Sequence, residues 1–324
     1  MESQLRDIIE ATKENVDFME NLQTKKVPSG PCSAYDLVYS WTNEDIAGCL
    51  NVAGVSSQKA LAVLSSGDHP FNLITLGATD VDTFDTNKLT EFYALGFKRA
   101  MILKYSYNRF MKIMEGLRYG KLGFADVNDL IKGLFPYMDR RHQIFFQELI
   151  DYTCNKKLPV NNLIDFLTRD EHDLWGYQLF GNNYLLSEEN YNRLRNNLSK
   201  ANITFNTVDA LDLKEKYSEH KYDAIMLSNI LDYFFRFSKF PWTYQTILSY
   251  EKDLEILLDK NGVLFLYYVF KTPAPDGWVY PFNRYNIIPE HLEEEELIRF
   301  ANCYGSDSAV VLKREGSKGR TLRI

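Results

Sequence analysis

Short apolar runs that each stop at a polar turn and precede a helical pattern constrain this chain more than any other feature. The first run, ALAVL at Ala60–Leu64, ends in the turn SSGDHP, and a short helical pattern follows. A second short strand, DVDTF at Asp80–Phe84, is expected from its pattern; it ends at DTN and precedes another helical pattern. Parallel strands need long crossover connections, which helices usually supply, so this order predicts an α/β fold.

Further strands are expected after a stretch of about 106–200 whose apolar spacing is helical throughout. They are expected at Ile203–Val208, Tyr222–Leu227 and Val263–Phe270, with a helix at about Tyr244–Asp259. The tail predicts a helix near Glu290–Phe300 and an antiparallel hairpin of Ala301–Tyr304 and Ala309–Lys313. Together these patterns predict a Rossmann-like sheet of seven strands with an antiparallel terminal hairpin.

The chain is long enough to bury a large core, because 45% of its 324 residues are hydrophobic. We expect a helical cap at 1–57 and an α/β domain at 58–324, with a helical insertion at about 106–200. The four cysteines are far apart and form no C-x-x-C pair. They predict reduced thiols and no metal site.

Charge and hydropathy exclude several classes of protein. A net charge of −7 argues against a nucleic-acid partner held by a general phosphate-binding surface. The longest apolar run, Val263–Phe270, is far shorter than the roughly 18 residues of a membrane span, and the N-terminus lacks the pattern of a secretory signal. We therefore expect a cytoplasmic protein with no transmembrane segment. A basic, aromatic stretch from Lys98 to Lys121 leaves peripheral membrane contact open, although a solvated helix face is the favoured interpretation.

Candidate binding residues follow the strands, because ligands of open parallel sheets sit beyond the carboxyl ends of the strands. These residues are Ser65, Ser66, Gly67, Asp68 and His69 after the first strand, Asp85, Thr86 and Asn87 after the second, Asp209, Ala210 and Leu211 after the third, and Ser228 and Asn229 after the fourth. The first turn has one glycine where a dinucleotide fingerprint has three. A single glycine disfavours a ligand with a pyrophosphate. It fits S-adenosyl-L-methionine, whose only anionic group is a carboxylate.

In that interpretation the amino-acid end of S-adenosylmethionine lies against the first turn and Asp85 accepts hydrogen bonds from the ribose. The adenine lies near Asp209–Leu211. Tyr39 and Trp41 are candidates for ring faces against the positive sulfonium, although core packing also explains them. The expected catalytic residues are Asn229, Asp232 and Tyr233, with Asp232 as a base if burial raises its pKa, or as a helix-start carboxylate.

Three segments resemble the betaine-lipid synthase family of S-adenosylmethionine:diacylglycerol aminocarboxypropyl transferases. They are VLSSGDHPFNLITLGATDVDTFDTNKLTEFYALGFKRAMI, YDAIMLSNILDYF and the upstream YSWTNED, within about residues 39–270. The resemblance implies a class I methyltransferase-like fold and transfer of the aminocarboxypropyl group. The chain departs from the family pattern at Ser228-Asn229, where lipid-forming members carry Asp-His, and at Tyr267, Tyr268 and Lys271, where no arginine is recognisable.

The sequence thus predicts an S-adenosylmethionine-dependent transferase whose acceptor is an unidentified small molecule or lipid. A small-molecule methyltransferase is the first alternative, because the same sulfonium offers its methyl carbon to a nucleophile. The second alternative is a non-catalytic binding module with the same fold. Formation of a homodimer through the N-terminal helices is part of that second alternative.

Overall fold

The computed structural model describes residues 2–20, 34–35, 40–42, 44–53, 58–119, 121–158, 181–230, 244–269, 298–302, 305–315 and 320–323. The chain divides into two compact units. Unit 1 comprises Met1–Thr42, Leu64–Gly67 and Thr86–Asp173, and unit 2 comprises Asn43–Val63, Asp68–Asp85 and Leu174–Ile324.

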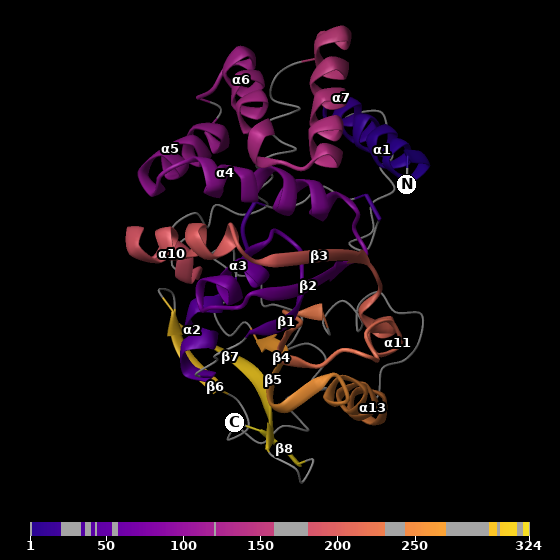
Figure 1. The fold of residues 1–324 in the computed structure, drawn as a ribbon, viewed down its shortest axis with the longest axis vertical. Helices are drawn as coiled ribbons and strands as arrows, with labels where there is room; N and C mark the ends of the chain where they lie inside the picture. Colours follow the sequence, from indigo (N-terminus) through magenta and orange to yellow (C-terminus); the bar gives the residue numbers. More distant parts are fainter. Residues whose placement is uncertain are drawn as a thin grey trace. The chain divides into compact units, whose positions relative to one another are not determined.

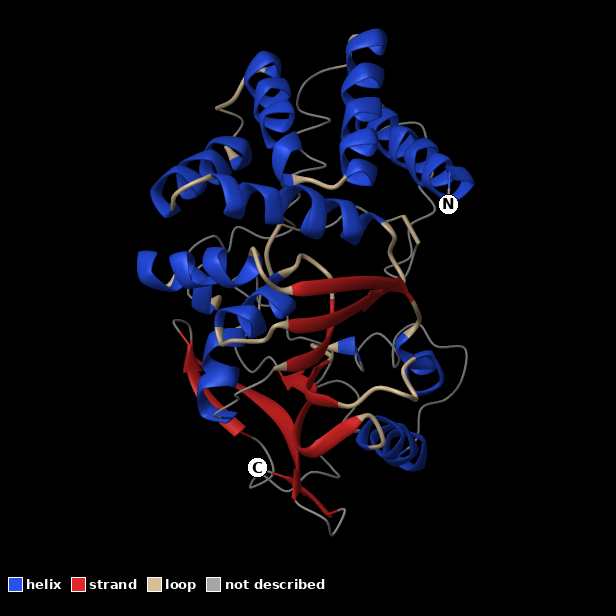
Figure 2. Cartoon of the chain, viewed as in Figure 1, coloured by secondary structure: helices blue, strands red, loops and turns tan. Residues whose placement is uncertain are grey.

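All the described strands belong to one sheet in unit 2 (Figure 2). They are β1 (Lys59–Val63), β2 (Asp80–Asp85), β3 (Asn202–Thr207), β4 (Tyr222–Met226), β5 (Leu258–Val269), β6 (Ile298–Asn302), β7 (Gly305–Glu315) and β8 (Arg320–Arg323). The order is β3-β2-β1-β4-β5-β7-β6, and β8 pairs with β7 (Figure 1). The first five strands in this order are parallel, whereas β7 is antiparallel to its neighbours.

The predicted α/β class with a parallel sheet is confirmed, but the strand count differs, since the described residues form eight strands. β6 begins at Ile298, inside a predicted helix. β5 begins at Leu258, before the expected start at Val263 and inside the expected helix at Tyr244–Asp259, so Asn261 and Gly262 lie within a strand. A Cβ at Gly262 would lie 2.7 Å from the carbonyl oxygen of Tyr222. This glycine therefore allows β5 to approach β4, where the register shifts.

Helices of unit 2 pack on this sheet. They are α2 (Ile46–Ala53), α3 (Asp68–Thr75), η3 (Asn183–Leu185), α10 (Glu188–Leu198), η4 (Ala210–Asp212), α11 (Leu213–Lys216) and α13 (Tyr244–Glu255). α3 packs against β1 and α10, and the Ser187 side chain caps α10 by accepting from the Asn190 N–H. The core between sheet and helices includes Leu61, Ile225 and Leu264, all fully buried.

Unit 1 is helical in its described residues. Its helices are α1 (Glu2–Glu20), the π-helix η1 (Glu91–Lys98), α4 (Arg99–Lys104), α5 (Tyr107–Arg118), α6 (Phe124–Leu134), η2 (Phe135–Tyr137) and α7 (Arg140–Lys156). Asp139 caps α7 by accepting from the His142 N–H, and Phe92 stacks on Phe145 at 4.0 Å. Gly96 lets η1 approach α7, because a Cβ there would lie 3.2 Å from the ring of Phe146. Among the described helices, none combines the length and apolar composition needed to cross a bilayer.

Candidate functional site

The carboxyl ends of the parallel strands lie at one edge of the sheet in unit 2. Strand β1 pairs with β2 on one side and β4 on the other, with Val63 opposite Phe84 and Ala62 opposite Met226. The chain winds from β1 to β2 and β3 in one direction, and β4 and β5 lie in the other. Such a switch point between β1 and β4 is where open α/β sheets bind ligands.

Three side chains meet at this switch point and form what we call the Glu44–His69–Ser228 cluster. His69, in the first turn of α3, places its Nε2 2.9 Å from Oε2 of Glu44. The Ser228 hydroxyl, just after β4, donates to the other carboxylate oxygen of Glu44. The side chains of His69 and Glu44 are 0% and 3% exposed. A buried carboxylate is stable only when it is paired and hydrogen-bonded, and here it accepts from both sides.

Backbone geometry holds Glu44 and Ser228 in this arrangement. Ser228 has φ 63°, a left-handed conformation that is costly for a residue with a Cβ and is concentrated at functional sites. A Cβ at Gly181 would lie 2.5 Å from the carbonyl oxygen of Glu44, so only glycine permits this close approach. The Gly181 carbonyl also accepts from the Ala47 N–H at 2.9 Å. The segment that carries Glu44 therefore lies close against Gly181.

The cluster differs from a nucleophilic triad in the order of its members. The carboxylate lies between the histidine and the serine, so His69 does not contact Ser228 and cannot take its proton. The His69 Nδ1 is buried and has no hydrogen-bond partner. An unsatisfied buried polar atom costs about 1–3 kcal/mol, so a ligand that bonds to this nitrogen would recover that energy. The arrangement suits an imidazole that accepts a hydrogen bond from a substrate or donates one to it.

The start of α3 is tied to η3 by buried polar contacts. Asp68 accepts a 2.6 Å hydrogen bond from the hydroxyl of Tyr184. Asn72 donates to the Asp68 carbonyl and to Oδ1 of Asn182, and its own Oδ1 accepts from the Asn183 N–H. Asp68 was predicted to contact S-adenosylmethionine. In the structure it is fully buried and its carboxylate binds Tyr184.

Asp85 and Asp209 follow the neighbouring strands β2 and β3. Asp85 is half-buried at the end of β2, where its carbonyl accepts from the Val208 N–H. Asp209 is exposed and caps η4 by accepting from the Leu211 N–H at 3.0 Å. Ala210 is buried, whereas the apolar side chain of Leu211 is 45% exposed. Both aspartates thus lie at the predicted edge of the sheet.

In unit 1, the turn after β1 is held by a buried lysine. Ser65 and Gly67 both have positive φ, 46° and 87°. The Lys98 ammonium donates to the carbonyls of Ser66 at 3.1 Å and Ser40 at 2.9 Å, and lies 4.0 Å from the centre of the Trp41 ring. Lys98 is fully buried. The solvated-face interpretation of the basic stretch is therefore wrong for this residue, because it fixes the turn instead.

Other predicted residues have local roles or lie elsewhere. Asn87 caps the turn into the next helix by accepting from the Leu89 N–H at 3.0 Å, and Thr86 is half-buried beside it. Trp41 is buried and packs edge-on against Phe110. Asn229 is half-buried next to Ser228. Tyr39, Asp232 and Tyr233 lie outside the described residues.

Glu44 is the member of the Glu44–His69–Ser228 cluster that sequence reasoning did not single out. It lies in the YSWTNED segment, but nothing in that segment indicates a partner 25 positions later in His69. The signal in the sequence was the place of Glu44 in the YSWTNED segment, one of the three segments that carry the family resemblance.

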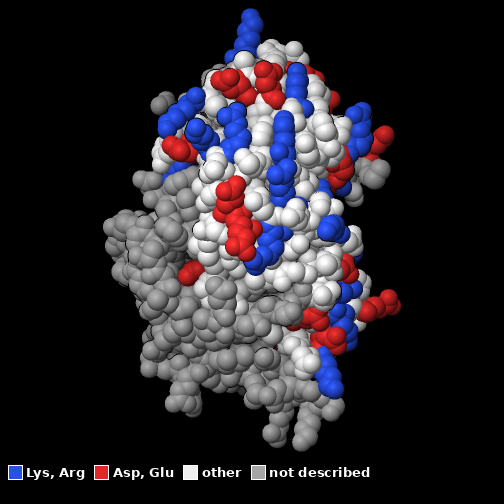
Figure 3. Space-filling model, turned by 60° about the vertical axis from the view of Figure 1, so that its left-hand side comes forward, with Lys and Arg blue, Asp and Glu red and all other residues white. Residues whose placement is uncertain are grey.

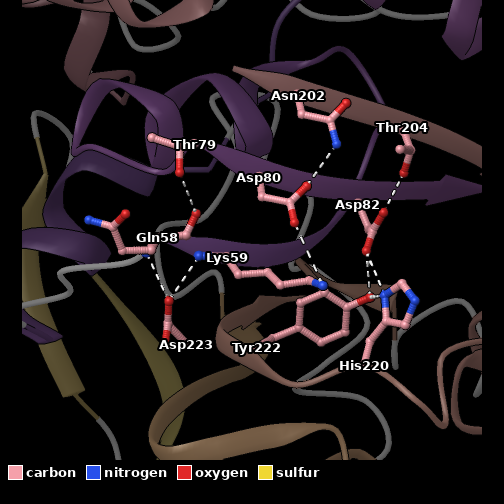
Figure 4. A network of polar contacts seen from close by, with 10 residues as sticks. All are labelled: Gln58, Lys59, Thr79, Asp80, Asp82, Asn202, Thr204, His220, Tyr222 and Asp223. Carbon is pink, nitrogen blue, oxygen red and sulfur yellow. Dashed lines mark hydrogen bonds and ion pairs between the residues drawn. The ribbon is translucent and has the colours of Figure 1, made fainter. Parts of the chain in front are cut away.

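A second polar network lies at the amino ends of the strands (Figure 4). Asp82 accepts from the hydroxyls of Thr204 and Tyr222 and contacts Nδ1 of His220 at 3.0 Å. Burial alone would raise the pKa of Asp82, but these hydrogen bonds lower it below its ordinary value. Asp223 accepts from the backbone N–H groups of Gln58 and Lys59. This network connects β2, β3 and β4 through hydrogen bonds between their side chains. The Glu44–His69–Ser228 cluster lies at the opposite, carboxyl edge of the sheet.

Charge is mixed over the face shown in Figure 3, where basic and acidic side chains alternate among uncharged ones. Within the basic stretch, Lys121 pairs with Glu115 at 3.1 Å and Lys104 donates to the Gly133 carbonyl. The described residues contain no group of three or more His, Cys, Asp or Glu side chains placed to hold a metal ion. Of the cysteines in that part of the chain, Cys49 is buried and Cys154 is exposed, and both are free thiols.

Comparison with known proteins produced no match, either to a protein-family model or to a curated protein sequence.

Proposed function

We propose that this chain is an S-adenosylmethionine-dependent transferase. It moves the aminocarboxypropyl group to a small-molecule or lipid acceptor, with methyl transfer as the alternative outcome of the same site. The observation that carries the proposal is the Glu44–His69–Ser228 cluster at the switch point of a parallel sheet. There Nδ1 of His69, which is buried and has no hydrogen-bond partner, lies at the position where such sheets bind ligands.

Two features favour S-adenosylmethionine over a dinucleotide. The segment between β1 and α3 contains one glycine, and a pyrophosphate needs backbone approach at several positions. Asp85 lies at the end of β2, where an acidic side chain accepts hydrogen bonds from ribose hydroxyls. The antiparallel β7 beside β5 also agrees with a class I methyltransferase-like sheet, as the resemblance to betaine-lipid synthases implies.

In this proposal Asp85 holds the ribose, and Asp209 to Leu211 line the adenine. The bound sulfonium supplies an electrophilic carbon beside sulfur, which needs orientation more than activation. Asn229 lies next to the cluster and would border the reacting centre. Because Ser228-Asn229 replaces the acidic and basic pair of lipid-forming relatives, we do not assign diacylglycerol as the acceptor.

Titration calorimetry with S-adenosylmethionine tests this proposal through Asp85→Asn. A hydrogen bond to a charged group contributes about 1.5–3 kcal/mol, so the variant should bind about 10- to 100-fold more weakly. Asp80→Asn is the matched control, since Asp80 lies at the opposite end of β2 and contacts Asn202 and Lys59. Its affinity should equal that of the wild type. Equal affinity in Asp85→Asn, or no binding by the wild type, would refute the assignment.

A further inference from the structure

We propose that His69 is the general base of the transfer reaction and that Glu44 positions it. This inference rests on the proposed function and deepens it, since the carbon electrophile comes from S-adenosylmethionine and the proton from the acceptor. It assigns to the acceptor a hydroxyl or amine that carries a removable proton. His69 thereby becomes a catalytic residue, whereas the sequence suggested only a contact to the cofactor.

The contacts of His69 define which ring nitrogen is available. Glu44 binds Nε2 at 2.9 Å, and a carboxylate can only accept, so Nε2 carries the proton of the neutral ring. Nδ1 therefore carries the lone pair. This nitrogen is the buried one that has no partner in the structure. Carboxylate on one nitrogen and a free lone pair on the other is the arrangement of a histidine base.

Ser228 completes the arrangement by occupying the second oxygen of Glu44. With hydrogen bonds to both oxygens, the carboxylate keeps its orientation toward Nε2 of His69. A carboxylate in this position stabilises the imidazolium that forms when His69 takes a proton. Ser228 has a left-handed backbone conformation, and its hydroxyl contacts Glu44.

The transfer forms one bond to the acceptor and breaks one bond to sulfur. A lone pair of the acceptor oxygen or nitrogen attacks the carbon next to the sulfonium, and a new C–O or C–N bond forms. The C–S bond breaks, and its electron pair stays on sulfur, which becomes a neutral thioether. The acceptor proton moves to Nδ1 of His69, and the imidazolium later releases it to solvent. No oxidant, reductant or metal is needed.

The tautomer is the first test and needs no acceptor. Nitrogen NMR of protein labelled with ¹⁵N-histidine, at alkaline pH, distinguishes a ring nitrogen with a lone pair from one with a proton. The His69 signals are assigned by their loss in His69→Gln. We expect the proton on Nε2 and the lone pair on Nδ1 in the wild type, and a loss of this preference in Glu44→Gln. A proton on Nδ1 would overturn the proposal.

Turnover and binding provide the second test. The wild type, His69→Gln and Glu44→Gln are incubated with radiolabelled S-adenosylmethionine and a protein-free cell extract of small molecules and lipids. General bases contribute about 10²–10⁴-fold, so both variants should lose at least about 100-fold in turnover. Calorimetric affinity for S-adenosylmethionine should change less than about threefold. His220→Gln is the matched control, because His220 also pairs with a carboxylate, Asp82, at 3.0 Å, and should retain full turnover.

The outcomes separate this inference from the proposed function. If the wild type does not bind S-adenosylmethionine, or binds it without turnover, both fail. If the wild type turns over and His69→Gln does so within about threefold, only the base assignment fails. If His69→Gln loses affinity for S-adenosylmethionine as much as it loses turnover, His69 is a cofactor contact and the base assignment is again overturned.

Discussion

Replacing Tyr222 by Phe removes one hydrogen bond from a buried carboxylate and leaves the aromatic ring in place. Tyr222 is fully buried, and its hydroxyl donates to Oδ2 of Asp82 at 2.8 Å. The side chain of Asp82 is 8% exposed. Hydrogen bonds to charged groups contribute about 1.5–3 kcal/mol to the free energy of unfolding. Because both partners are buried, we expect this bond to lie in the upper part of that range, at about 2–3 kcal/mol.

Thermal unfolding followed by circular dichroism measures this loss. At about 2–4 °C per kcal/mol, Tyr222→Phe should lower Tm by about 4–12 °C. Tyr250→Phe is the matched control, because its buried hydroxyl donates to an uncharged acceptor, the Ala210 carbonyl, at 3.1 Å. That variant should lose only about 1 kcal/mol. Equal losses in the two variants would refute the argument that the charge of Asp82 strengthens the network.

The loss of stability in Tyr222→Phe should depend on pH. The pKa of Asp82 is lowered in the folded state, so its stabilisation is present above the unfolded value of about 4 and is lost as the pH falls. Tyr222→Phe removes a contact that lowers this pKa, so its stability should decline at a higher pH than that of the wild type. The difference between the two proteins should be largest at neutral pH and shrink in acid. A constant difference would contradict the role of Asp82.

Two substitutions and one labelling experiment test other buried groups. Asn72→Ala removes three hydrogen bonds at the start of α3 and should lower the free energy of unfolding by about 2–4 kcal/mol, measured by urea unfolding. Lys98→Met removes the hydrogen bonds from the ammonium to the buried carbonyls of Ser40 and Ser66 and should destabilise the protein by about 2–4 kcal/mol, more than Lys104→Met, which removes one hydrogen bond to the Gly133 carbonyl. Iodoacetamide should label Cys154 in the folded protein before Cys49, because burial, and then Glu44 and Asp45, raise the pKa of the Cys49 thiol; peptide mass spectrometry checks the order, and equal rates would contradict it.

The central strands were predictable because their signal is local. The runs at 60–64, 80–84 and 222–227 match β1, β2 and β4 closely, since buried parallel strands are short, apolar and bounded by turn residues. The start of β5 was missed because Asn261-Gly262 is typical of the end of a helix, and the segment before it was expected to be helical. There the close approach to Tyr222, which depends on tertiary packing, decides the conformation.

The candidate site was predictable only in part. Strand-end residues such as Asp85 and His69 follow from the order of the elements. The contacts of His69 do not, because its partner Glu44, and Ser228, which contacts Glu44, come from distant parts of the chain. Lys98 shows the opposite error, since spacing suggested an exposed charge. Its burial depends on carbonyl oxygens that sequence patterns do not display.

The identity of the nucleoside product tests the central claim most directly. The pure protein is incubated with S-adenosylmethionine and a protein-free extract of small molecules and lipids, and the products are identified by mass spectrometry. We predict methylthioadenosine, which remains when the aminocarboxypropyl group is transferred. S-adenosylhomocysteine would establish methyl transfer instead. Recovery of unchanged S-adenosylmethionine would contradict the assignment of this chain as a transferase.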